Sequence, residues 1–369
     1  MRFFAALAVV ITHIELLKGQ YLKPNLWQEN KLVFELGALG VVFFFVLSGF
    51  LITYLLLKEK EKTNTISIVK FYTRRILRIW PLYFLIMSIG FFLLPNFTIF
   101  DHGYFTKFFK ENFWSNLILY ILILPNLAFS FFKPVPHIGQ LWSIGVEEQF
   151  YLIWPWLVKW SKRLLPVLLG VVVVCVLVKA IIQLCVMLQP TNETLSHLKT
   201  FVASLKFESM AIGGIGAWCV HNDKYYKVIL NNISLLASFI LILISVYFTP
   251  AVIQDGMFLV QSLLFLIIIL NVSCNPKSIL KLENKLFVLL GNISYGIYMY
   301  HMIIIAIVIV SFNAYNIEIS NNPIQQIILY AVCLGLTVLV SWLSYNCFEK
   351  YFVRLKNKST IIESGPRNQ

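Results

Sequence analysis

The stretch Arg2-FFAALAVVIT-His13 carries an ionisable side chain at each end of ten uncharged residues that are typical of a membrane-spanning helix. An ionisable side chain inside such a helix is energetically costly and usually marks a functional site. At a rise of 1.5 Å per residue, the eleven-residue step puts His13 about 16 Å further along the helix than Arg2. If Arg2 lies at one membrane face, His13 lies near the bilayer centre. We therefore expect a site that reaches into a membrane.

Composition assigns the rest of the chain to the membrane as well. Of its 369 residues, 59% are hydrophobic and 13% are charged, and the mean hydropathy is +0.78. Soluble domains carry about 25% charged residues, so we interpret the chain as an all-α integral membrane protein. The formal charge of +13 is explained more simply by basic cytoplasmic loops than by binding to nucleic acid. The six cysteines show no metal-ligand spacing, so we expect no metal.

Eleven apolar segments are candidate membrane spans, and Pro125-Asn126 interrupts one of them, 114–132. If that segment does not cross and Arg2 starts in the cytoplasm, most of the 30 basic residues fall in cytoplasmic segments, as the positive-inside rule favours. We therefore predict about ten transmembrane helices with both termini cytoplasmic, and a re-entrant or interfacial element near 114–132. The segments are 3–17, 37–57, 80–94, 114–132, 142–160, 164–188, 207–221, 229–248, 257–272, 289–311 and 326–347.

Three arginines stand together at the predicted cytoplasmic mouth of the third span, in the run Arg74-Arg75-Ile76-Leu77-Arg78. Arg75 and Arg78 are spaced i to i+3 and share one helical face. Guanidinium groups bind phosphate oxygens through two parallel hydrogen bonds. The alternative is a basic anchor on anionic lipid headgroups. Because Arg2 is predicted to lie at the same membrane face, a phosphate pocket formed by Arg2, Arg75 and Arg78 becomes more plausible.

The second span carries small residues at Gly37, Gly40 and Gly49. Small residues let membrane helices approach closely, so we assign this stretch to helix packing. Ser48 is the one polar side chain between Gly37 and Phe50, and we interpret it as a hydrogen bonder between helices rather than as a catalytic group.

The run Trp142-Ser143-Ile144-Gly145-Val146-Glu147-Glu148 opens another span at its predicted outer mouth. Adjacent carboxylates point about 100° apart on a helix, so at most one of the two faces a given cleft. Glu147, flanked by Trp142 and Tyr151, is a candidate proton acceptor or a group that holds a sugar hydroxyl. The alternative is that one of the two glutamates pairs with a structural arginine or lysine.

The run Ser294-Tyr295-Gly296-Ile297-Tyr298-Met299-Tyr300-His301 lies in a span predicted to run from the cytoplasm outwards. His301 then has about the same depth in the membrane as His13. Two histidines at matched depth on different spans are more informative than one. The alternative is that His301 is a buried helix-packing group.

Taken in order, these motifs resemble the acyltransferase 3 family of membrane-bound acyltransferases. The similar parts are Arg2-x10-His13, GALGVVFFFVLSGFLI from Gly37, Arg75-x-x-Arg78 with the following Ile-Trp-Pro-x-Tyr, WSIGVEEQFYLIWP from Trp142, and SYGIYMYH from Ser294. They cover most of residues 1–160 and 289–349, whereas 164–288 is similar only in being rich in spans. The family acylates extracytoplasmic sugars, and its donor is generally acyl-CoA from the cytoplasm.

The resemblance implies a catalytic role for His13, with Arg2 as its partner and with Arg75 and Arg78 binding the phosphates of the donor. Family members usually have a short lead such as Leu-Asp-Gly-Leu before the arginine, whereas here Met1 precedes it directly. We expect a stand-alone member without the extracytoplasmic SGNH-type domain of the fused type. Residues 1–349 would form the transmembrane domain, followed by a short basic cytoplasmic tail at 350–369.

The expected reaction is O-acetyl transfer from acetyl-CoA to a hydroxyl of a polysaccharide or lipid-linked sugar, across the inner (cytoplasmic) membrane. His13, neutral at rest because a buried imidazole resists charging, would act as general base. We assign Glu147 a catalytic role, and we expect four residues to bind the acceptor. These are Trp142, Ser143, Tyr295 and His301.

Two other classes of protein remain open. A transporter or flippase for a polar lipid or sugar would use the same intramembrane histidine, arginine and glutamate, although the chain shows no internal repeat of the kind common in transporters. A sensory or scaffold protein would bind acyl-CoA without turnover. Release of free CoA in the presence of an acceptor distinguishes the enzyme from both.

Overall fold

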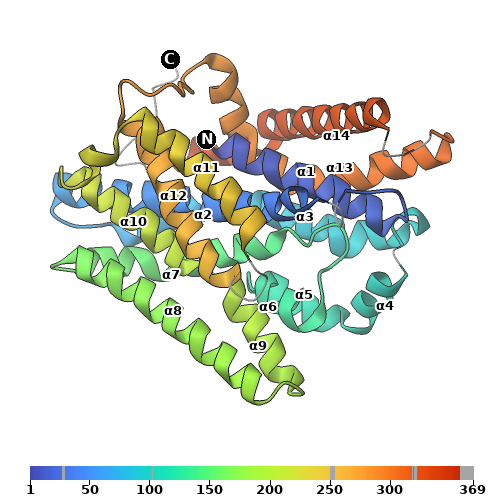
Figure 1. Ribbon diagram of the computed structural model, residues 1–369. Helices are drawn as coiled ribbons and strands as arrows, with labels where there is room; N and C mark the ends of the chain where they lie inside the picture. The colour runs from blue at the N-terminus through green and yellow to red at the C-terminus, as the bar shows by residue number, and fades with distance from the viewer. Residues whose placement is uncertain (27–29, 102, 250–253, 318, 320–321, 358–369) are drawn as a thin grey trace. The chain divides into compact units, whose positions relative to one another are not determined.

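The computed structural model describes residues 1–26, 30–101, 103–249, 254–317, 319 and 322–357 (Figure 1). These residues form helices joined by turns and loops, with no strand among them, so the all-helical prediction is confirmed. The α-helices are α1 (Arg2–Gln20), α2 (Lys31–Thr63), α3 (Ile68–Ser88), α4 (Tyr104–Glu111), α5 (Phe113–Ile121), α6 (Pro125–Phe132), α7 (Leu141–Trp160), α8 (Leu164–Leu188), α9 (Glu193–Ser204), α10 (Phe207–His221), α11 (Asn232–Phe248), α12 (Gln254–Cys274), α13 (Lys285–Ala314), α14 (Pro323–Ser344) and α15 (Lys350–Asn357).

Within the described residues, seven helices are long and apolar enough to cross a membrane, so the chain is a multi-pass membrane protein. Helices α7, α10 and α11 coincide with predicted spans but are not among the seven. The count of about ten crossings and the cytoplasmic termini therefore stay predictions. The seven are Arg2–Gln20, Lys31–Thr63, Ile68–Asn96, Leu164–Leu188, Gly256–Cys274, Ser294–Ala314 and Pro323–Lys356.

The interrupted segment 114–132 forms two short helices, α5 and α6. Pro125 is at the start of α6, where its missing N–H costs no helical hydrogen bond, and Ile123 in the intervening turn has a φ of 58°. With nine and eight residues, neither helix reaches the roughly 30 Å of a hydrocarbon core. The break agrees with a segment that does not cross, and its re-entrant or interfacial position stays a prediction.

The chain divides into two compact units, and α2, α3 and α7 each contribute to both. Unit 1 comprises Met1–Val41, Arg78–Val146 and Lys285–Val353. Unit 2 comprises Val42–Leu77, Glu147–Asn284 and the described residues from Arg354 onward. Helix α15 occupies the start of the predicted basic tail, and 358–369 lie outside the described residues. The single transmembrane domain at 1–349 stays a prediction.

In unit 1, α1 packs against α13 and α14, and the three helices can be followed side by side in Figure 1. Ala6, Val10, Ile14 and Leu17 are spaced by three or four residues, so they form one apolar stripe on α1. This stripe is buried in a cluster with apolar residues of α13 and α14. The same packing brings His13, one residue before Ile14 of the stripe, into contact with α13.

Glycines let α2 approach its neighbours within each unit. In unit 1, a Cβ added at Gly40 would lie 2.7 Å from the carbonyl oxygen of Ala5 on α1, closer than any real contact. In unit 2, a Cβ added at Gly49 would overlap the carbonyl oxygen of Met210 on α10. The predicted packing role of these two residues is confirmed, because any side chain at either position would push the helices apart.

Candidate functional site

His13 on α1 and His301 on α13 lie in direct contact within unit 1. Their rings are stacked with centroids 4.9 Å apart and an interplanar angle of 29°. The distance from His13 Nδ1 to His301 Nε2 is 2.8 Å, which is a hydrogen bond. His301 is 0% exposed, whereas His13 is only half-buried. The histidines that the sequence predicts at matched depth therefore form a pair in which His13 is the more exposed residue.

The far side of the His301 ring is held by the main chain of its own helix. His301 Nδ1 lies 2.6 Å from the carbonyl oxygen of Tyr298, one turn earlier on α13. The Tyr298 hydroxyl donates to the carbonyl oxygen of Gln140 at 3.0 Å and lies 2.6 Å from Ser143 Oγ. Gln140 Nε2 in turn donates to the carbonyl oxygen of Met299 at 2.9 Å. The turn that carries His301 is thus tied to the beginning of α7.

Two other residues assigned to the acceptor also lie in unit 1. Tyr295 donates its hydroxyl to the carbonyl oxygen of Ile79 at 2.8 Å, which links α13 to α3. Trp142 is half-buried, and its ring centroid lies 6.5 Å from that of Phe129 on α6. The structure therefore shows helix-to-helix contacts for both residues, and their role toward an acceptor stays a prediction.

Glu147 belongs to a polar cluster in unit 2. Its side chain is 4% exposed and accepts a hydrogen bond of 2.9 Å from the Tyr151 hydroxyl, one turn later on α7. The same hydroxyl is hydrogen bonded to Ser48 Oγ on α2, so the predicted interhelical role of Ser48 is confirmed. Sequence reasoning did not assign a role to Tyr151, although its i+4 spacing from Glu147 was a usable signal.

Arg74 and Arg75 have different environments in unit 2. Arg74 Nη2 lies 3.1 Å from Glu59 Oε2, so its charge is paired with a buried carboxylate of α2. The Arg75 guanidinium lies over the rings of Phe71 and Tyr151, at 5.6 and 5.2 Å from their centroids. Such cation–π contacts hold the guanidinium in place, and the N–H donors at its edge can still form hydrogen bonds with an anion.

Arg2 and Arg78 belong to unit 1, and both are half-buried. Arg2 is the first residue of α1, eleven residues before His13. Arg78 lies close enough to the Glu349 carboxyl for their charges to interact. The phosphate pocket that the sequence predicts from Arg2, Arg75 and Arg78 stays a prediction.

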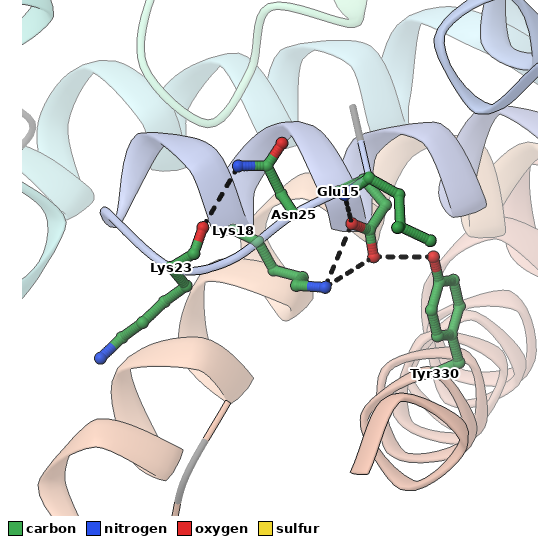
Figure 2. A network of polar contacts seen from close by, with 6 residues as sticks. Glu15, Lys18, Lys23, Asn25 and Tyr330 are labelled. Atoms are coloured by element: carbon green, nitrogen blue, oxygen red, sulfur yellow. Dashed lines mark hydrogen bonds and ion pairs between the residues drawn. The ribbon is translucent and has the colours of Figure 1, made fainter. Parts of the chain in front are cut away.

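A second polar network in unit 1 begins two residues after His13 (Figure 2). Glu15 and Lys18 are both 0% exposed, and Lys18 Nζ lies 2.9 and 3.1 Å from the two Glu15 oxygens. Figure 2 shows the Tyr330 hydroxyl of α14 donating to Glu15 Oε1, at 2.8 Å. The main-chain N–H of Leu26 donates to the other oxygen. The carboxylate is therefore matched by four hydrogen bonds, which join α1, the following loop and α14.

Among the described residues, no group of three or more histidine, cysteine, aspartate or glutamate side chains could hold a metal ion. All six cysteines are free thiols. The imidazole nitrogens of the histidine pair can donate and accept protons.

Comparisons with known proteins add to this geometry. A family described as an acyltransferase domain matches residues 1–346. A Staphylococcus aureus (strain COL) protein named as a putative O-acetyltransferase is 28% identical over 377 residues, covering 95% of this chain and 56% of the relative. Peptidoglycan O-acetyltransferase OatA of Listeria monocytogenes serovar 1/2a is 28% identical over 367 residues, covering 88% of this chain and 54% of OatA.

The Bacillus subtilis (strain 168) protein YrhL, named as a putative peptidoglycan O-acetyltransferase, is 28% identical over 384 residues, covering 95% of this chain and 53% of YrhL. The chain thus spans about half the length of the curated relatives it matches. No solved structure matches it.

Proposed function

Since the chain belongs to the acyltransferase 3 family, we propose that it is a membrane O-acetyltransferase. The donor is cytoplasmic acetyl-CoA, and the acceptor is a hydroxyl of an extracytoplasmic carbohydrate such as an exopolysaccharide, a capsule, an O-antigen or peptidoglycan. The names of the Listeria and Bacillus relatives support a glycan acceptor. A site inside the cytoplasmic membrane would suit this reaction, because the two substrates occupy opposite sides of it.

The observation that carries this proposal is the contact between His13 and His301. An imidazole that is hydrogen bonded to a second imidazole, on a residue that is only half-buried, suits a general base. His13 removes the proton of the acceptor hydroxyl, and the resulting alkoxide attacks the thioester carbonyl of acetyl-CoA. A C–O bond forms, the C–S bond breaks, and the proton on His13 passes to the sulfur of the departing CoA. An acetyl-histidine intermediate is the alternative route.

The roles of the arginines follow the family resemblance, and those of the acceptor residues follow from the sequence run at Trp142–Glu148. Arg2, Arg75 and Arg78 bind the phosphates of acetyl-CoA. Glu147, Trp142 and Ser143 face the acceptor, and Glu147 orients its hydroxyl or accepts a proton from it. The stacking of Arg75 on Phe71 and Tyr151 supports a phosphate role, because it leaves the guanidinium edge in a defined orientation.

The experiment that tests the function uses membranes that contain the full chain, acetyl-CoA labelled in its acetyl group, and a panel of isolated glycans that includes peptidoglycan. We expect label in at least one glycan, with one free CoA released for each acetyl group transferred. Movement of a lipid or sugar across the membrane without CoA release would indicate a transporter instead. Neither label nor CoA release, from membranes in which the chain is folded, contradicts the proposal.

Replacing Arg75 with alanine is expected to weaken donor binding far more than acceptor binding. Hydrogen bonds to charged groups contribute about 1.5–3 kcal/mol each, so the KM for acetyl-CoA should rise at least about tenfold. The KM for the acceptor should change less than about twofold, and we expect the same pattern for Arg78→Ala. Steady-state kinetics with each substrate varied in turn measures both constants.

Lys70→Ala is the matched control for Arg75→Ala, because Lys70 is an exposed basic residue five positions earlier on α3. It removes the same charge from the same helix, and we expect it to leave both KM values unchanged. Equal losses for donor and acceptor in Arg75→Ala would count against a phosphate role and would favour the lipid-headgroup anchor.

A further inference from the structure

We infer that His301 is a positioning residue that holds His13 in one tautomer, with the proton on Nδ1 and the lone pair on Nε2. This inference rests on the proposed function in one respect only, namely that the lone pair on His13 Nε2 removes the proton of the acceptor hydroxyl. The tautomer itself follows from two hydrogen bonds within unit 1 and from the burial of His301.

The first step starts at the Tyr298 carbonyl oxygen, which can only accept a hydrogen bond. Because His301 Nδ1 lies 2.6 Å from that oxygen, this nitrogen must carry a proton. A neutral imidazole has one N–H, so the other nitrogen of His301, Nε2, is bare and can only accept.

The second step determines which nitrogen donates the hydrogen bond between the two rings. His13 Nδ1 lies 2.8 Å from His301 Nε2, and one of these two atoms must donate. Because Nε2 of His301 is bare, the donor is the Nδ1–H of His13. The single proton of a neutral His13 is then committed to Nδ1, and its Nε2 carries a lone pair. This is the form that a general base requires.

The opposite arrangement would need a charged His301 that donates from both nitrogens, which would move the His13 proton to Nε2 and abolish the base. His301 is 0% exposed, and burying a charge without an opposite charge beside it is costly. The nearby carboxylate on α1, Glu15, is already matched by Lys18 and Tyr330. The surroundings therefore favour two neutral rings.

Hydrogen bonds of the Tyr298 side chain help to fix the carbonyl oxygen that accepts from His301. Its hydroxyl is bonded to Gln140 and Ser143 at the beginning of α7, so the turn of α13 that carries the accepting carbonyl is held from the side. When His13 takes a proton on Nε2 during the reaction, its Nδ1–H still donates to His301. The neutral ring of His301 then stabilises the imidazolium, and the proton leaves again from Nε2 toward the CoA sulfur.

Two substitutions at position 301 separate positioning from packing. In His301→Gln, the amide N–H can donate to the Tyr298 carbonyl while the amide oxygen accepts from His13 Nδ1, which preserves both directions. In His301→Leu, the space is filled and the acceptor is lost. We expect kcat within about tenfold of wild type for His301→Gln and at least about 100-fold lower for His301→Leu, with both KM values unchanged.

An equal loss of kcat in the two variants, or a loss confined to KM, would overturn the positioning role. His197→Gln is the matched control, since it removes a histidine from α9 in unit 2 and should leave kcat unchanged. These kinetics also require that the wild-type chain transfers acetyl groups.

A second measurement does not depend on activity or on a folded His301→Leu protein. The full chain, labelled with ¹⁵N in its histidine rings and placed in lipid bilayers, is studied by solid-state NMR, with His13→Gln and His301→Gln used to assign signals. We expect a protonated Nδ1 and a bare Nε2 on both rings. A proton on Nε2 of His13 would refute the inference. The expected tautomer in a chain that transfers no acetyl group would refute only the proposed function.

Discussion

The His13→Ala protein is expected to transfer acetyl groups about 1,000-fold more slowly than the wild type, while it still inserts and folds. A positioned general base contributes about 10²- to 10⁴-fold to a rate, and alanine removes the nitrogen that takes the hydroxyl proton. His13 is half-buried and does not belong to the apolar stripe of α1. Its replacement by alanine should therefore leave the packing of that stripe intact. Acetyl transfer to the glycan and size-exclusion behaviour in detergent measure the two quantities.

Leu16→Ala is the matched control for this prediction. Leu16 is also half-buried on α1, so the substitution shortens a side chain of the same helix without touching an imidazole. We expect its rate of acetyl transfer to stay close to that of the wild type. Normal glycan modification by His13→Ala would refute the catalytic assignment, and an equally large loss in Leu16→Ala would show that the effect is a general one on α1.

Replacing Lys18 with methionine is expected to destabilise the protein by about 3–5 kcal/mol. The substitution leaves the Glu15 carboxylate without its cation at a position that is 0% exposed, and a buried charge without a partner is strongly unfavourable. Tyr330→Phe removes only one neutral donor from the same carboxylate and should cost about 1 kcal/mol. Thermal unfolding in detergent, followed by the loss of folded protein, measures the change.

The double variant Glu15→Gln with Lys18→Met tests the mechanism of this loss. It removes both charges together, so we expect it to recover most of the stability that Lys18→Met loses. Lys227→Met is the control, because Lys227 forms its ion pair with Asp223 at an exposed position and should show no measurable change. If Lys18→Met unfolds like the wild type, the buried ion pair does not stabilise unit 1.

Helix content was predictable because the apolar runs are long and nearly free of charge, and each predicted span is helical in the structure. The break at 114–132 was predictable for a local reason, since Pro125 lacks an N–H and starts a new helix. The close approach at Gly40 and Gly49 was predictable because small residues on a membrane helix have few other uses.

Several partners within each unit were not predictable. Arg74 and Arg75 are adjacent in the sequence, which did not indicate that their partners differ. Arg74 pairs with Glu59, whereas Arg75 lies over two aromatic rings. Likewise, nothing near Tyr295 in the chain indicated that its hydroxyl bonds to the carbonyl oxygen of Ile79, 216 residues away. Helical periodicity shows which residues share a face of one helix, but it does not show which other helix that face meets.

The sequence by itself determined that this is an all-helical membrane protein whose motifs resemble those of an acyltransferase family, and it predicted similar depths for His13 and His301 on their spans. The fold class depends on composition and the predicted depths depend on distance along one helix, whereas the family resemblance depends on the order of the motifs. Only the tertiary structure decided that the two rings touch across 288 residues of chain, and that the Tyr298 carbonyl directs their protons. A hydrogen bond needs atoms within about 3 Å, and only the packing of α1 against α13 brings these nitrogens that close.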